Sequence, residues 1–203
     1  MKWKRLLSLV ASVGIVAAMQ ALPAPPANAY CTTGIGRWLY SDYTPIVRPS
    51  VPSTWNTAIT SARAQWNGIS GSTLHYYTPT FNSNIANPEF QLYLADFGYA
   101  GLPDVPGISL GADVAKHSTV SIALNSNFTW NTSGTMSQSG RKVDVWTIVV
   151  HEMGHASGLA HPYASVCGSG HPTTAEKASV MYVDWTKKRY PNADDKAGIA
   201  SRY

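Results

Sequence analysis

Apolar and polar residues alternate along several short stretches of the chain, and a period of two predicts β-strands. These stretches lie at 37–45, 74–80, 89–97, 108–115 and 118–127. Only a few residues separate the last two, so a short turn is expected at Lys116–His117. The pattern therefore predicts that most of the chain before residue 130 is built from strands and loops.

Two other stretches repeat their apolar residues every three or four positions, which predicts helices. In 51–70, Ser53 follows a proline and is a candidate N-cap. The apolar positions at helical spacing there are Trp55, Ile59, Ala62 and Trp66. We expect both tryptophans to pack in the core. The stretch 143–159 is apolar on most sides and is predicted to form a buried helix.

The end of the chain, 192–203, contains Asp194 and Asp195, either of which is expected to cap a short final helix. The predicted order is therefore strand, helix, several strands, helix and an irregular tail. This order is typical of an α+β domain in which both helices pack on one sheet. Residues 30–203 are enough for a single domain with a substantial core.

The first 29 residues have the character of a secretory signal peptide. A basic start is followed by an apolar run, which is too short to span a bilayer, and by the small-residue ending Ala27-Asn28-Ala29. We therefore expect 1–29 to be removed and 30–203 to be a secreted, extracellular protein with no membrane partner. Three of the 15 Lys and Arg residues lie in 1–29, which leaves 12 against 11 Asp and Glu, so the net charge falls from +4 to +1. Such a small charge does not favour nucleic acid as a partner.

Cys31 and Cys167 are the only cysteines in the sequence. An even number of cysteines in an exported chain predicts a disulfide between them. Two alternatives remain open at this point: a pair of buried free thiols, or Cys31 as a thiol that blocks a metal site. The second alternative is weaker because Cys31 lies two residues after the expected cleavage site, which leaves no pro-segment to carry it.

The stretch HEMGHASGLAH, which begins at His151, contains a complete set of residues for metal chemistry. On a helix His151 and His155 lie on the same face, and neutral imidazole is a standard zinc ligand. Gly158 can end the helix in a left-handed conformation, so that His161 returns as a third ligand. Three protein ligands leave a position for water, which is typical of a catalytic zinc site, and Glu152 is placed to take a proton from that water.

These residues match H-E-x-x-H-x-x-G-x-x-H, so the chain resembles the metzincin zinc metalloproteases, and within them it is most similar to the small secreted bacterial matrixins. The stretch SVMY resembles the Met-turn of this family, in which Met181 would pack beneath the zinc without binding it. An ordinary core methionine is the alternative. Tyr182 directly follows Met181, whereas astacins and serralysins place a tyrosine where this chain has Val183. The ending DDKAGIASRY is also similar to the matrixin ending.

The resemblance implies a metzincin fold: a twisted, mainly parallel five-stranded sheet with a backing helix and an active-site helix. A small irregular C-terminal subdomain ending in a helix would follow. The upper subdomain would be 30–158 and the lower subdomain 159–203. The implied activity is that of a secreted zinc-dependent endopeptidase, monomeric, with one catalytic Zn²⁺ and Glu152 as general base. The polypeptide substrate would lie extended along the sheet edge at 108–115, and Tyr182 and Trp185 would line a substrate pocket. Core packing is the alternative for Trp185.

Departures from the family pattern bear on other metals. A structural zinc is not expected, because GYAG stands at 98–101 where the family has a His-x-Asp. The remaining histidines are too scattered in sequence to replace it: His75, His117 and His171. Calcium is left open, because the available carboxylates are few for a cage of six or more oxygens: Asp96, Asp104 and Asp113. Two other functions also stay open, namely a zinc hydrolase acting on a different amide and a catalytically silent binding module.

Overall fold

The computed structural model describes residues 30–32, 36–112, 116–162, 167 and 172–203. The predicted signal peptide lies outside these residues, as do Asp113 and His171. No helix in the described part of the chain is long and apolar enough to cross a membrane. The fold is of the mixed α+β type, as predicted from the order of the elements.

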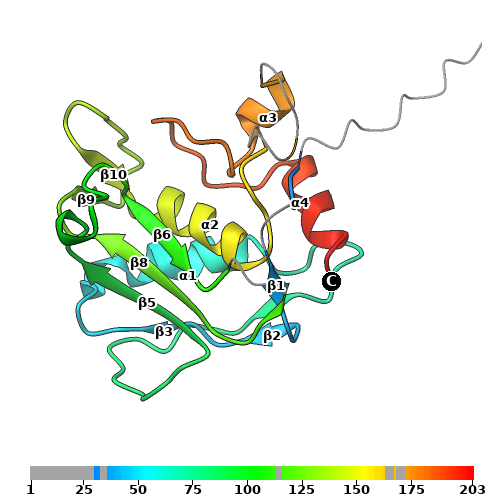
Figure 1. The fold of residues 1–203 in the computed structure, drawn as a ribbon, viewed down its shortest axis with the longest axis horizontal. Coiled ribbons are helices and arrows are strands. Elements are labelled where there is room, and N and C mark those ends of the chain that lie inside the picture. Colours follow the sequence, from blue (N-terminus) through cyan, green and yellow to red (C-terminus); the bar gives the residue numbers. More distant parts are fainter. Residues whose placement is uncertain (1–29, 33–35, 113–115, 163–166, 168–171) are drawn as a thin grey trace, which may run out of the picture.

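The main sheet has four strands in the order β3-β5-β8-β6 (Figure 1). Strand β3 (Ile46–Val47) pairs in parallel with β5 (Phe90–Ala95), which pairs in parallel with β8 (Val120–Asn125). Strand β6 (Gly107–Leu110) pairs antiparallel with β8 and forms one edge of the sheet. The predicted stretch 108–115 therefore supplies an edge strand, although the strand ends at Leu110.

The fifth strand of the predicted sheet is present only in pieces. Strand β4 (His75–Tyr76) pairs in parallel with β2 (Asp42–Tyr43), and a single bridge at Thr80 continues this pairing onto β3. Alternate amides of the β4 segment donate to the β2 segment until Pro79, which has no N–H to donate. Thr80 then donates to the carbonyl of Pro45 instead. The resulting slip interrupts the ladder, so a regular five-stranded sheet is not confirmed.

Two further parallel pairs lie outside the main sheet. Strand β1 (Arg37–Trp38) pairs with β7 (Lys116–His117), so the predicted turn at Lys116–His117 is wrong. These residues pair because Trp38 and His117 are both buried, with ring centroids 4.8 Å apart. Strands β9 (Thr129–Asn131) and β10 (Lys142–Asp144) form the other pair, which the alternation pattern did not predict.

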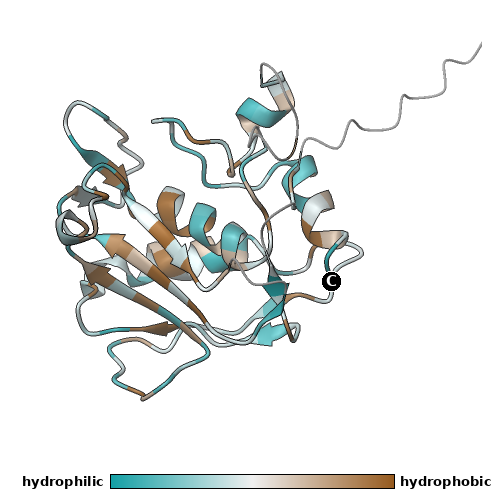
Figure 2. Ribbon diagram, in the orientation of Figure 1, coloured by the Kyte–Doolittle hydropathy of each residue, from teal (hydrophilic) through white to brown (hydrophobic). Residues whose placement is uncertain are grey.

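Two helices cover the same face of the sheet (Figure 1). A 3-10 turn, η1 (Ser53–Trp55), leads into α1 (Asn56–Ala64), so Ser53 lies inside the first turn and does not cap it. Helix α2 (Val145–Ala156) corresponds to the predicted buried helix. Apolar residues are concentrated in α2, β5 and β8, around the core between helices and sheet (Figure 2). Trp66 is fully buried there and its indole Nε1 donates to the carbonyl of Val150 at 3.0 Å, which confirms a packing role.

Shorter elements complete the chain. A second 3-10 turn, η2 (Gly98–Ala100), follows β5, and α3 (Thr174–Ala178) lies in the region where no element was predicted. The final helix, α4 (Ala193–Ala200), is present, but its N-cap is Asn192 and not either aspartate. Asn192 accepts from the amide of Asp195 and the Asp195 carboxylate accepts in return from the amide of Asn192, which is a capping box.

Candidate metal centre

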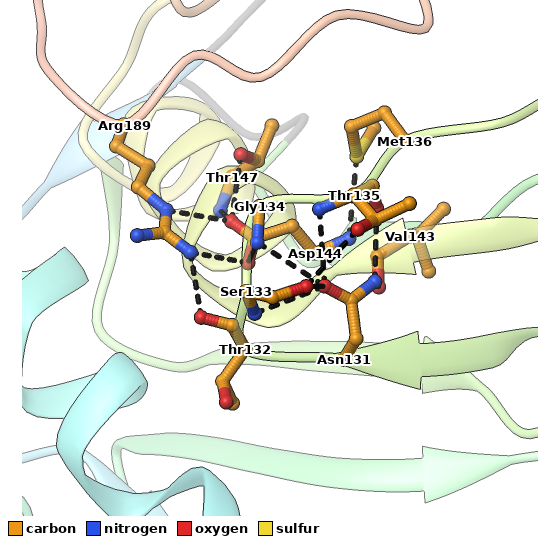
Figure 3. A network of polar contacts seen from close by, with 10 residues as sticks. All are labelled: Asn131, Thr132, Ser133, Gly134, Thr135, Met136, Val143, Asp144, Thr147 and Arg189. Carbon is orange, nitrogen blue, oxygen red and sulfur yellow. Dashed lines mark hydrogen bonds and ion pairs between the residues drawn. The ribbon is translucent and has the colours of Figure 1, made fainter.

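Helix α2 begins at a buried carboxylate that fixes its N-terminus. The side chain of Asp144 accepts from the amide of Thr147 at 2.9 Å and thereby caps the helix. Arg189, from the C-terminal segment, donates to both carboxylate oxygens of Asp144 at 2.6 and 2.9 Å. Gly134 also donates to this carboxylate, so three separate segments meet at one side chain (Figure 3).

Helix α2 ends where the sequence places a glycine. Gly158 has φ of +98°, a conformation that side chains with a Cβ rarely adopt. The amide of Leu159 donates to the carbonyl of Gly154, which closes the last turn in the manner of a Schellman cap. A Cβ at position 158 would also lie 2.8 Å from the carbonyl oxygen of Gly36. The glycine therefore allows the sharp turn after which His161 faces the helix.

The three histidines of the motif converge on one point. The Nε2 atoms of His151 and His155 are 3.1 Å apart, those of His155 and His161 are 3.1 Å apart, and those of His161 and His151 are 3.3 Å apart. Ligand nitrogens at about 2.0–2.1 Å from one tetrahedral zinc would be about 3.3 Å from each other. These three residues therefore fit a single metal ion, and together they form a group that could hold one.

Backbone carbonyls orient two of the imidazoles. Nδ1 of His151 lies 2.8 Å from the carbonyl oxygen of Val180, and Nδ1 of His155 lies 2.7 Å from that of Leu159. Because a carbonyl can only accept, each Nδ1 carries the proton and each Nε2 keeps its lone pair. Such outer contacts fix both the tautomer and the ring orientation of a metal-binding histidine.

Electrostatics keep the histidines neutral. Burial, and then the proximity of His161, lowers the pKa of His151 to about 4. Burial and the neighbouring imidazoles hold the pKa of His155 well below its ordinary value, and burial lowers the pKa of His161. Neutral imidazoles are the form that binds a metal, so the site is ready for an ion at neutral pH.

Glu152 lies beside the three histidines and is not one of the converging ligands. The residue is only 4% exposed, and the hydroxyl of Ser109 on β6 donates to its Oε2 at 2.9 Å. Burial raises the pKa of Glu152 to about 7, while the Ser109 hydrogen bond acts in the opposite direction. A carboxylate with a pKa near neutrality can both take up and return a proton.

Met181 is buried against α2, a position that suits both the predicted Met-turn and an ordinary core methionine. A Cβ on Gly154 would overlap the Met181 sulfur, so the glycine between the first two ligands makes room for it. The neighbouring Val180 supplies the carbonyl that orients His151. The segment at 179–181 is itself held by Asp195 of α4, whose carboxylate accepts from the Val180 amide at 3.0 Å.

A cavity of about 730 Å³ opens in front of the histidines and Glu152. Its apolar wall includes Phe128, Met136, Ile148 and Trp185. Trp185 and Tyr182 are both among the residues that line this cavity, and their role in binding substrate stays a prediction. Trp185 also stacks on Phe128 with ring centroids 6.0 Å apart, so it combines a cavity position with packing. Ser109, Phe128 and Met136 were not found from the sequence, because each comes from a strand or loop without a motif.

Cys31 and Cys167 form a disulfide across a sequence separation of 136 residues. The backbone of Cys31 also accepts a hydrogen bond from the amide of Ala160 at 2.7 Å. Ala160 directly precedes His161. The disulfide therefore lies next to the chain segment that carries the third histidine.

The other polar residues considered in the sequence lie apart from the three histidines or outside the described chain. His117 is buried and its Nε2 lies 2.9 Å from the carbonyl oxygen of Ala156, whereas His75 is exposed. Asp96 accepts from Asn127 and from the amide of Gly98. Asp104 pairs with Arg141 at the cavity rim.

Comparison with known proteins adds a distant likeness of fold. No family model matches this chain, and no curated protein matches it. A solved structure described as the structure of myroilysin aligns with 82% of this chain and 95% of its own. The sequence identity is 13% and the TM-score is 0.49. A likeness this distant assigns neither a family nor an activity.

Proposed function

We propose that this protein is a secreted, extracellular zinc endopeptidase of the metzincin type, similar to the matrixins. The observation that carries the proposal is the convergence of three Nε2 atoms to within 3.1–3.3 Å beside a buried glutamate. The order H-E-x-x-H-x-x-G-x-x-H supports the same conclusion, because each position has a separate physical role.

In the proposed mechanism His151, His155 and His161 hold the metal. When bound, zinc polarises the substrate carbonyl and acidifies water. Glu152 takes the proton of the attacking water and then delivers it to the leaving amine. Its raised pKa supports both steps, because a proton taken up near neutral pH can also be given away there.

The proposed substrate is a polypeptide that binds in an extended conformation. Among the described residues strand β6 pairs only with β8, and it also lines the cavity, so a substrate strand can add to its free edge. The apolar wall formed by Phe128, Met136 and Trp185 suits the side chain of the residue after the cut. We propose that the enzyme acts as a monomer.

The test combines metal analysis with hydrolysis of casein and of a peptide library. Chelation of the wild type should abolish cleavage, and stoichiometric zinc should restore it. The variant His161→Ala should lose both bound zinc and activity, whereas His75→Ala, which changes an exposed histidine, should keep both. A zinc-bound wild type that cleaves no protein or peptide would contradict the endopeptidase function and leave hydrolysis of another amide.

A further inference from the structure

Strand β6 lies directly against Glu152. Residues two apart in a strand point to the same face, so Gly107 and Ser109 both face α2. A Cβ on Gly107 would be 3.0 Å from Glu152 Oε1 and 2.9 Å from Ile148 Cγ2. The absence of a side chain at Gly107 is therefore what lets the strand approach, and Ser109 is the next residue on that face.

The hydroxyl of Ser109 contacts Glu152 at two atoms. Its Oγ is 2.8 Å from the backbone carbonyl oxygen of Glu152 and 2.9 Å from the side-chain Oε2. In the part of the chain that the structure describes, no other side chain hydrogen-bonds to this carboxylate. Ser109 is thus the polar contact that ties the carboxylate to a fixed point on α2 and on the sheet.

The second carboxylate oxygen of Glu152 has a different environment. Oε1 has no hydrogen-bond partner among the described residues, and Glu152 lines the cavity in front of the histidines. With Oε2 held by Ser109, Oε1 is the oxygen that remains for a water molecule in the cavity. The two oxygens are therefore distinguished by the protein before any substrate arrives.

We propose that Ser109 is a positioning residue that holds Oε2 of Glu152 and so presents Oε1 to the attacking water. This inference rests on the proposed peptidase function, in which Glu152 is the general base. Strand β6 then has two roles, because the strand whose free edge would receive the substrate also orients the base. A catalytic group misplaced by about 1 Å can slow a reaction on the order of 100-fold, so one hydroxyl can matter.

The kinetic test compares Ser109→Ala with Ser109→Thr, which keeps a hydroxyl in the strand. The kcat of zinc-loaded Ser109→Ala should fall on the order of 10- to 100-fold, with KM and zinc content unchanged. Ser109→Thr should recover most of the loss. The matched control is Ser121→Ala in the adjacent strand β8, because that hydroxyl binds Gln91 and not Glu152. This control should keep the wild-type kcat.

A second measurement reads the contact without using activity. Infrared difference spectra of wild type against Ser109→Ala, with ¹³C-labelled glutamate carboxyl groups, should show a shifted glutamate band. The shift should disappear when both proteins also carry Glu152→Gln. An absent shift would overturn the proposal, as would a wild-type kcat in Ser109→Ala or a loss of zinc from that variant. A shifted band in a protein that cleaves no peptide would instead preserve the contact and refute the peptidase function.

Discussion

At the scale of single residues, Glu152 places a largely buried ionisable group at the wall of the cavity. Its carboxylate is buried between α2 and β6, and burial raises its pKa to about 7. The pKa values of the neighbouring histidines are displaced in the opposite direction, because burial penalises their charged form. One environment therefore favours a proton acceptor near neutral pH and three unprotonated ligands.

Replacement of Glu152 by glutamine separates the base from the ligands. The amide keeps the size of the side chain and removes its ability to accept the proton, so Glu152→Gln should fold and keep about one zinc per chain. Turnover should fall at least about 100-fold, the lower end of the usual contribution of a positioned acid–base group. Metal analysis and peptide hydrolysis should be measured on the same preparation. Near-normal cleavage with zinc retained would mean that another group accepts the proton.

At the scale of elements, the N-terminus of α2 is fixed by a buried ion pair. The Asp144 side chain is fully buried and Arg189 is 17% exposed, with their closest atoms 2.6 Å apart (Figure 3). Arg189 follows the segment at 182–186, which lines the cavity, and it also donates to the carbonyl of Thr132 at 2.8 Å. The pair therefore joins the helix that carries His151 and His155 to the cavity wall.

Removal of the arginine should destabilise the fold strongly. Arg189→Met would leave the Asp144 carboxylate buried without its charge partner, and such a change costs about 3–5 kcal/mol. Urea unfolding should be compared with Arg141→Met, in which the pair to Asp104 is exposed and the expected loss is about 1 kcal/mol or less. Equal losses in the two variants would show that the buried pair contributes no more to the free energy of unfolding than the exposed pair does.

The same pair predicts a dependence of stability on pH. Burial alone would raise the pKa of Asp144, but the hydrogen bonds from Arg189 and Thr147 outweigh it and hold the pKa below its ordinary value. The contribution of Asp144 is therefore complete above the ordinary Asp pKa of about 3.9 and is lost as the pH falls through the lower folded value. The difference in free energy of unfolding between wild type and Asp144→Asn should be constant near neutrality and shrink below about pH 4. Urea titrations from about pH 7 to about pH 3 would measure it, and a difference independent of pH would contradict the assignment.

At the scale of the whole molecule, the disulfide connects the start of the described chain to the segment that follows the three histidines. Cys31 follows the predicted signal peptide, whereas Cys167 comes after His161. The backbone of Cys31 is also paired with Ala160. A loop of this length restricts the unfolded chain far more than a short one does.

Loss of the disulfide should lower stability by up to about 5 kcal/mol in the chain-entropy model. The double variant Cys31→Ser, Cys167→Ser should show this loss in guanidinium unfolding, together with weaker zinc retention because His161 lies beside the bridge. Thiol titration of the unfolded, unreduced wild type should find no free sulfhydryl group. Wild-type stability in the double variant would show that the backbone pairing at Ala160 suffices.

An element of the fold could be predicted from the sequence where its local hydrophobic pattern alone specifies the structure that it adopts in the folded protein. The α2 stretch is apolar on most sides and ends at a glycine, so its course follows from neighbouring residues alone. The prediction of one strand over 37–45 is wrong in its bounds, because the length of a strand depends on the strand with which it pairs. That stretch is divided between β1 and β2, and only the second pairs with the β4 segment that Pro79 interrupts.

The cap of the final helix was misplaced for a similar reason. Asn192 and Asp195 both suit an N-terminus, and the sequence alone does not rank them. In the fold, the Asp195 carboxylate also accepts from the amide of Val180, which places Asp195 inside the first turn beside the segment at 179–181. A contact with another part of the chain thus decided which residue became the cap.

The sequence by itself predicted the cluster of three histidines that could hold a metal, because residues four apart on a helix share a face and a glycine after the helix permits a sharp turn. It also predicted the disulfide, since only two cysteines are available, and the structure shows that they are joined. Only the tertiary structure decided that Ser109 meets Glu152 and that Arg189 meets Asp144. The residues of these two pairs are 43 and 45 positions apart in the sequence. The helical and strand periods relate only residues a few positions apart, so they do not predict these contacts. They are brought together by the order of strands in the sheet and by the packing of the C-terminal segment against α2.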